Sequence, residues 1–110
     1  MGYVVKHSRI KPKYNPQPNA QEQRHEERIR QLPCIGCGSW EVELHHTMLD
    51  FPGKRFRRDH RFQIPVCPAC HRGCDGIHGI GSEAEWAERH GLDTPAIAQR
   101  LWQESLDEQH

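Results

Sequence analysis

The stretches PCIGCG at residues 33–38 and CPACH at residues 67–71 decide how this chain folds. Each contains a Cys-x2-Cys knuckle, and 29 residues separate the first knuckle from the second. Zinc takes four soft ligands in a tetrahedron, and two short knuckles of this kind supply them with little strain. We therefore predict a structural zinc ion held by four cysteines, Cys34, Cys37, Cys67 and Cys70.

The segment between the knuckles is long enough for a β-hairpin. Residues 41–47, EVELHHT, place Val42 and Leu44 on one face, as in a half-buried strand, and residues 61–67, RFQIPVC, predict a second strand. Residues 69–79 predict a short helix or turn. The zinc ion would clamp both ends of this ββα unit and contribute on the order of 10 kcal/mol to folding. That contribution matters because only 35% of the chain is hydrophobic.

The flanking segments predict a basic arm and several helices. Residues 1–19 contain three prolines and four cations but no acidic residue, which predicts a flexible arm preceding a domain over residues 20–110. Helix-capping patterns mark the helices of that domain. The expected helices are 20–31 after a cap at Asn19, 82–90 with Ser82 and Glu85 in a capping box, and 95–108 after a cap at Thr94.

The composition excludes some classes of protein. No apolar run approaches the roughly 18 residues that a transmembrane helix needs, and the first residues lack the apolar core of a secretory signal. We therefore expect a reducing cytoplasm, in which the knuckles bind metal rather than form disulfides. Cys74 lies outside both knuckles, and it is either a free thiol or an alternative ligand in place of Cys70.

Charge is divided unevenly along a chain whose net charge is zero. Residues 1–72 contain 13 Lys/Arg and 7 Asp/Glu, whereas residues 73–110 contain 2 and 8. A basic front suits a protein that presents one face to a polyanion. The acidic half has a simpler interpretation as a solvated helical surface.

Histidines concentrate between the knuckles and just after them. His45 and His46 are neighbours on a predicted strand, so their side chains point to opposite faces, and one can hold a metal while the other reaches a substrate. An imidazole also accepts protons at neutral pH, because its ordinary pKa is about 6.5. The candidate set comprises five histidines and one carboxylate, namely His45, His46, His60, His71, His78 and Asp59.

In this order, the motifs ELHHT, GKRFRRDHRFQIPVC and CPACHRGCDGIH resemble the HNH (ββα-metal, His-Me finger) endonuclease superfamily. They are most similar to small phage and prophage nucleases of the recombination-enhancing type, and the resemblance extends over about residues 28–103. It implies a small α+β fold with a zinc-clamped, treble-clef-like ββα-metal core and flanking helices. It further implies a metal-dependent DNA endonuclease in the cytoplasm of a bacterial host. Because the sequence shows no recognition helix with base-reading side chains, we expect low sequence specificity.

The resemblance also assigns roles to single residues. It implies that His45 binds a catalytic divalent ion and that His46 is the general base that activates water. The middle position of the motif, often Asn or Asp in the family, falls on His60, with Asp59 one residue out of register as a carboxylate ligand. His71 and His78 fall on the remaining ligand positions.

The ligand types indicate which ions the second site would take. A site rich in imidazole favours Mn²⁺, Ni²⁺, Co²⁺ or Zn²⁺, whereas Mg²⁺ prefers oxygen ligands. We therefore expect a two-metal protein with one closed structural zinc site. Its open catalytic site would take a divalent cation such as Mg²⁺, Mn²⁺, Ni²⁺ or Zn²⁺.

Cations between the two predicted strands are candidates for DNA contacts. Guanidinium groups fork onto phosphate oxygens, and Arg72, beside His71, is placed to reach the scissile phosphate. The resemblance implies DNA as substrate, with a recombinase filament or another phage or host replication–recombination protein as partner. The loop cations are Lys54, Arg55, Arg57, Arg58 and Arg61, and the alternative is that they only solvate the loop.

Two other functions are compatible with the sequence. The first is a noncatalytic zinc-ribbon module that binds nucleic acid or a partner protein, in which the cysteines would be essential and the histidines dispensable. The second is a redox or metal-storage protein, which the strand-bearing order around the ligands disfavours.

Overall fold

The computed structural model describes residues 17–109, a small α+β structure with one two-stranded sheet. Residues 1–16 of the predicted basic arm lie outside this range. None of the helices in the described range combines the length and apolar content that a membrane crossing requires. The elements are α2 (Ala20–Ile29), β1 (Glu43–His46), β2 (Gln63–Val66), α3 (Pro68–Arg72), α4 (Ile77–Ile80), α5 (Glu83–His90) and α6 (Thr94–Glu108).

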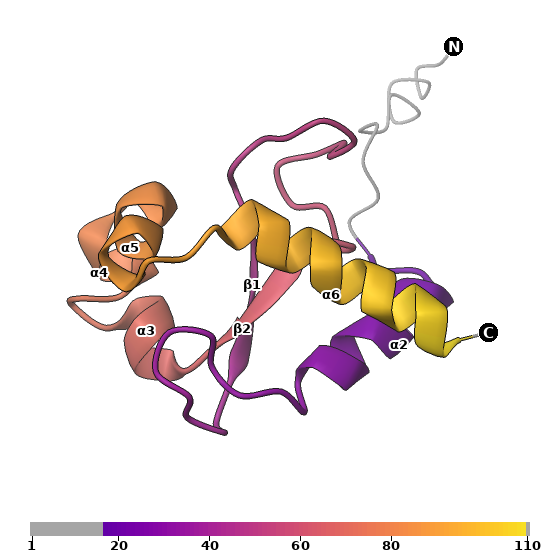
Figure 1. Cartoon of the computed structure of the whole chain (residues 1–110), viewed down its shortest axis with the longest axis horizontal. Coiled ribbons are helices and arrows are strands. Elements are labelled where there is room, and N and C mark those ends of the chain that lie inside the picture. The colour runs from indigo at the N-terminus through magenta and orange to yellow at the C-terminus, as the bar shows by residue number, and fades with distance from the viewer. Residues whose placement is uncertain (1–16, 110) are drawn as a thin grey trace, which may run out of the picture.

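The predicted hairpin is present, with shorter strands than the sequence pattern indicates. β1 and β2 pair antiparallel in a register that sets Glu43 opposite Val66 and His46 opposite Gln63. Every residue of β2 is buried, and α2, α3 and α6 all contact it (Figure 1). The Pro65 carbonyl accepts a hydrogen bond from Ile35 N at 3.1 Å, which fastens the first knuckle to β2.

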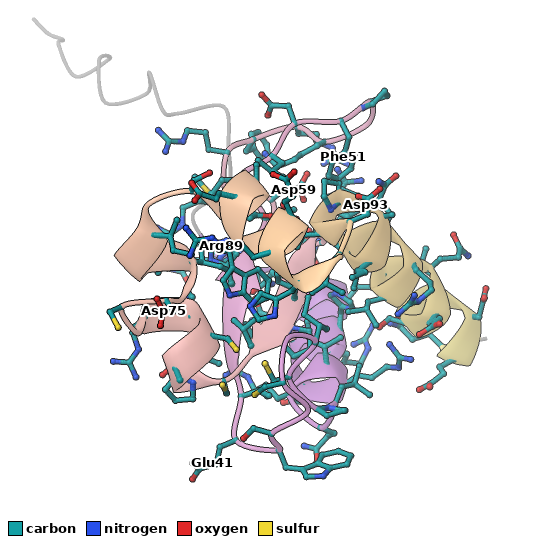
Figure 2. The ribbon with its side chains drawn as sticks, turned by 60° about the vertical axis from the view of Figure 1, so that its left-hand side comes forward. Glu41, Phe51, Asp59, Asp75, Arg89 and Asp93 are labelled. Carbon is teal, nitrogen blue, oxygen red and sulfur yellow. The ribbon has the colours of Figure 1, made fainter. Side chains whose placement is uncertain are left out.

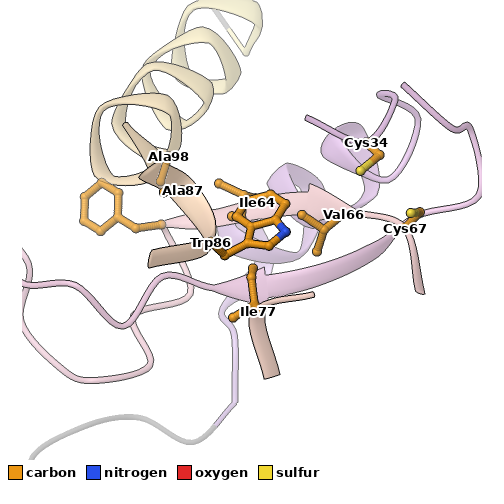
Figure 3. Close-up of a cluster of buried hydrophobic side chains, with 9 residues drawn as sticks. Cys34, Ile64, Val66, Cys67, Ile77, Trp86, Ala87 and Ala98 are labelled. Carbon is orange, nitrogen blue, oxygen red and sulfur yellow. The ribbon is translucent and has the colours of Figure 1, made fainter. Parts of the chain in front are cut away.

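The core is centred on Trp86 of α5, whose indole lies among Ile64, Val66 and Ile77 (Figure 3). Trp86 is fully buried, and it also packs against the first knuckle. A Cβ added at Gly36 would lie 2.7 Å from Cζ2 of that indole, so any larger residue would have to displace the indole or the knuckle. The small core therefore joins α5, the hairpin and the cysteine knuckle into one unit.

Helix caps agree with the sequence prediction at α2 and differ at α5 and α6. Asn19 caps α2 as predicted, and Glu22 adds a capping box that was not predicted from the sequence. Ser82 caps α5 through Glu85 N, but the Glu85 carboxylate pairs with Arg89 and does not close a box. The prediction of Thr94 as a cap is wrong.

Asp93 caps α6 in place of Thr94, accepting from Ala96 N at 3.0 Å. The Thr94 hydroxyl is instead turned inward, where it bonds Glu83 at 2.6 Å. The segment over residues 69–79, predicted as one short helix or turn, contains two helices, α3 and α4. Gly73 follows α3 and Gly76 precedes α4, and both have an extended backbone. The chain is therefore not helical between α3 and α4.

Candidate functional site

Four cysteine sulfurs converge where the two knuckles meet. The Sγ atoms of Cys34, Cys37, Cys67 and Cys70 all lie within 4.8 Å of one another, and all are free thiols. Backbone amides point at two of them, with Gly36 N 3.3 Å from Cys34 Sγ and Cys70 N 3.4 Å from Cys67 Sγ. The cluster could therefore hold a metal ion such as zinc, as the spacing of the knuckles predicts.

The protonation of these thiols also fits a metal site. Burial raises the pKa of Cys34, but hydrogen bonds from backbone amides outweigh it and lower the value to about 7. Burial and the neighbouring Cys34 sulfur raise the pKa of Cys70. One thiolate is thus stabilised while a second beside it is disfavoured, and a bound cation would remove that conflict. Cys74 is exposed and lies outside the cluster.

Three imidazoles from three different elements converge at a second place, which we call the histidine trio: His45, His71 and His78. His45 Nδ1 lies 3.3 Å from His71 Nε2, and His71 Nε2 lies 3.1 Å from His78 Nε2. A Cβ at Gly79 would lie 2.0 Å from the Gly73 carbonyl oxygen, so only glycine allows α4 to approach closely enough to bring His78 in. Three ring nitrogens so arranged could bind one metal ion.

Carboxylates fix the orientation of two members of the trio. His45 Nε2 lies 3.0 Å from a Glu83 oxygen, and His71 Nδ1 lies 2.8 Å from a Glu43 oxygen. Each imidazole therefore donates its N–H to a carboxylate and turns its other nitrogen, with the lone pair, toward the trio. This is the arrangement by which proteins fix the tautomer of metal-binding histidines and raise their basicity.

Glu83 is the more deeply buried of these two carboxylates, with 6% of the residue exposed. Besides His45, it accepts hydrogen bonds from Thr47 Oγ1 at 2.5 Å, Met48 N at 2.8 Å and Thr94 Oγ1 at 2.6 Å. Burial raises the pKa of Glu83, but these donors outweigh it and lower the value to about 2. The Glu83 side chain therefore stays ionised at the start of α5 and connects this helix to β1.

Glu43 holds Arg72 as well as His71. Arg72 Nε and Nη2 donate to the two Glu43 oxygens at 3.0 and 2.5 Å, and the Arg72 and His71 bonds lower the pKa of Glu43 to about 2. Arg72 was expected to reach the scissile phosphate; it is 62% exposed but fastened to Glu43. Glu43 was not identified from the sequence as part of the site. Its position two residues before His45 could have indicated it, because both side chains then lie on one face of the strand.

His46 lies on the opposite side of β1 from His45, as the strand periodicity predicts. Its Nε2 is 2.9 Å from His60 Nδ1, and Glu26 Oε2 lies 3.9 Å from the same His60 atom. Burial is the main cause that lowers the pKa of His46 to about 4, with smaller effects from His60 and Arg58. His46 is therefore unprotonated at neutral pH.

Asp59 was predicted as a ligand, but the structure places it outside the trio. It is 2% exposed and pairs with Arg61 at 2.7 Å while accepting from the backbone N–H groups of Arg55 and Arg61. Burial opposes ionisation, but these donors lower the pKa of Asp59. Its oxygens are thus engaged in holding the loop between β1 and β2, at the end of the molecule away from Glu41 (Figure 2).

The loop cations divide into structural and exposed groups. The Lys54 ammonium bonds the Phe56 carbonyl, and its side chain is only 1% exposed, so it cannot meet a phosphate without moving. Arg61 bonds Asp59 and the Gly53 carbonyl. The remaining cations, Arg55, Arg57 and Arg58, are exposed.

The arrangement combines four thiols that could hold one metal ion, three imidazoles that could hold another, and an unprotonated imidazole, His46, on the other side of the same strand. The chain matches no family model, no curated protein and no solved structure.

Proposed function

We propose that this protein is a metal-dependent DNA endonuclease with a ββα core of the HNH kind, which hydrolyses phosphodiester bonds with little sequence preference. The observation that carries the proposal is the convergence of His45, His71 and His78, two of them oriented by carboxylates. A binding module needs no such set beside its zinc cluster. The four cysteines would hold a structural zinc, since four protein ligands close a site, whereas three leave room for substrate.

The trio would bind the catalytic ion through His45 Nδ1, His71 Nε2 and His78 Nε2, the atoms that face one another. A divalent ion held there would supply positive charge to the scissile phosphate and the leaving 3′ oxygen. Glu83 and Glu43 fix the tautomers of two ligands, because each accepts the N–H of one imidazole and leaves the lone pair of its other ring nitrogen toward the trio. The ligand geometry is thus preorganised before substrate arrives.

His46 is suited to take the proton from the attacking water. It is unprotonated at neutral pH, and a phosphate placed nearby would raise its pKa because negative charge favours the imidazolium. Within residues 17–109 β1 pairs with β2 alone. A phosphate lying along the other edge of β1 could therefore meet side chains from both of its faces, the trio on one and His46 on the other.

The exposed arginines of the loop are proposed to bind the DNA backbone. Arg58 is close enough to His46 to lower its pKa, so this part of the loop borders the proposed base. Arg57 is exposed beside it. Contacts from such side chains fix the position of the backbone but carry no base specificity. A recombinase filament or another replication–recombination protein is the proposed partner that prepares the substrate.

The test is a cleavage assay on supercoiled plasmid and on single-stranded circles, with Mg²⁺, Mn²⁺, Ni²⁺ or EDTA. The wild-type protein and His90→Ala, an exposed histidine outside the site, should nick with a divalent ion and not in EDTA. His46→Ala should bind DNA and retain its zinc but lose cleavage. Binding without cleavage by the wild-type protein in every metal, with a recombinase filament also supplied, would contradict the proposal and favour a zinc-binding module.

A further inference from the structure

A second set of ligand atoms converges on the His46 side of β1. It contains Glu26 from α2, His46 from β1 and His60 from the loop, and one ligand atom from each lies within 4.8 Å of the other two. His46 Nε2 and His60 Nδ1 are 2.9 Å apart, and Glu26 Oε2 is 3.9 Å from His60 Nδ1. We call this group the Glu26 cluster.

The atoms of the cluster meet at one point and do not form a chain. In a proton relay the middle imidazole uses both of its nitrogens, as His71 does when one nitrogen bonds Glu43 and the other faces the trio. His60 instead directs the same nitrogen, Nδ1, toward both His46 and Glu26. Convergence of two imidazole nitrogens and a carboxylate oxygen on one point is the geometry of a cation site.

The charge of the cluster also favours a cation. The Glu26 and His60 side chains are only 16% and 15% exposed, and the group that fixes the carboxylate is a neutral amide, Gln63 Nε2, at 2.8 Å. Among the described residues, the ion pair of Glu26 is with His60 alone. A carboxylate oxygen held in a partly buried place beside two imidazole nitrogens is a ligand set that a divalent ion can bind.

We propose that Glu26, His46 and His60 form a second open metal site, which takes a borderline transition-metal ion such as Zn²⁺, and that its occupancy switches off His46. Two imidazoles and one carboxylate are a known ligand set for zinc with a position left open, and imidazole selects Zn²⁺ over Mg²⁺. Zinc lies about 2.0–2.2 Å from its nitrogen and oxygen ligands. Glu26 Oε2 lies 3.9 Å from His60 Nδ1, so the Glu26 carboxylate must move toward the two imidazoles when the ion binds.

The inhibitory half of this inference rests on the proposed function. An imidazole that binds an ion through Nε2 carries its proton on Nδ1, and it then has no lone pair left for a proton from water. The ion would compete with the 2.9 Å contact between His46 and His60, not with the trio. Zinc at this site therefore inhibits cleavage even while the trio holds its catalytic ion, and dialysis into zinc-free buffer that contains Mn²⁺ restores activity.

The binding test counts zinc on the full chain by equilibrium dialysis at micromolar free Zn²⁺. Glu26→Gln should bind about one ion fewer than the wild-type protein, and Glu27→Gln, the exposed neighbour on the same helix, should bind as the wild type does. Loss of a group that merely orients a ligand costs about 10–100-fold in affinity, so loss of this ligand should cost at least as much. His60→Gln is the second variant, expected to lose the same ion. Equal zinc counts in folded wild-type, Glu26→Gln and His60→Gln proteins would overturn the site.

The inhibition test adds Zn²⁺ to a cleavage reaction run with Mn²⁺. Wild type and Glu27→Gln should be inhibited at the zinc concentration that fills the extra site, and Glu26→Gln should need at least about tenfold more. Inhibition equal in all three proteins would overturn the switch. If Glu26→Gln loses an ion while the wild-type protein cleaves nothing in any metal, the proposed nuclease function fails and the metal site stands.

Discussion

Replacing Glu83 with glutamine tests how α5 supports the histidine trio. The amide has the shape of the carboxylate but no charge, and its oxygen can still accept from His45 and Met48 N. Its NH₂ group would face the hydroxyls of Thr47 and Thr94, which can rotate to accept. The substitution therefore preserves the packing and removes the charge that the four donors stabilise.

The magnitude follows from the pKa of Glu83, which these donors lower from 4.5 to about 2. At roughly 1.4 kcal/mol per unit of pKa, Glu83→Gln should lower the free energy of unfolding by about 3 kcal/mol at pH 7. Because the folded-state pKa is lowered, this stabilisation is complete above about pH 4.5 and is lost as the pH falls toward 2. The difference between wild type and variant should thus be constant from pH 7 to pH 5 and shrink below pH 4.5.

The assay is urea unfolding of both proteins between pH 7 and pH 4, with metal content measured in every sample. Glu85→Gln is the matched control, since Glu85 also lies in the first turn of α5 but is exposed and pairs with Arg89. Its substitution should cost no more than about 1 kcal/mol. If Glu83→Gln is within about 1 kcal/mol of Glu85→Gln at pH 7, the role assigned to Glu83 is refuted.

Three further substitutions test the knuckles and the loop. Cys37→Ser should release the zinc and abolish cooperative unfolding, as structural zinc contributes on the order of 10 kcal/mol, whereas Cys74→Ser should retain both; an unchanged melting curve for Cys37→Ser would argue against the clamp. Gly36→Ala should destabilise the protein by about 1–3 kcal/mol because its Cβ overlaps the buried indole. An unchanged melting temperature would show that the knuckle does not pack against Trp86. Arg57→Ala combined with Arg58→Ala should weaken DNA binding and reduce the salt slope by about 2 on duplex DNA; an unchanged slope would move the contact surface elsewhere.

Much of this architecture could be predicted from local sequence patterns. Knuckle spacing brings the four cysteines together, and the period of two along residues 43–46 separates His45 from His46. Asn19 and Glu22 sit three residues apart, so a capping box can be recognised without knowing the rest of the fold. Each of these features depends on residues that are close in sequence, and the structure shows each at the position that its pattern indicates.

The carboxylates that complete the site depend on contacts between distant segments. Glu83 follows the helix cap Ser82 in an ordinary N-terminal pattern, and no local sequence feature indicates that this first turn contacts β1. Glu26 lies on a helix with little apolar periodicity, so its inward orientation is equally hidden. Lys54 reads as a loop cation, but its stem is buried, and that burial depends on how the whole loop folds.

The most direct test of the central claim measures metal binding and cleavage in one titration. Mn²⁺ would be added to protein that carries one zinc ion per chain, in the cysteine cluster, while bound Mn²⁺ is followed by electron paramagnetic resonance and nicking of plasmid is followed in parallel. We expect binding and cleavage to saturate together in the wild-type protein, His71→Ala to lose both, and His46→Ala to lose cleavage alone. If His71→Ala still cleaves DNA, or still binds Mn²⁺ as the wild type does, the histidine trio is not the catalytic metal site.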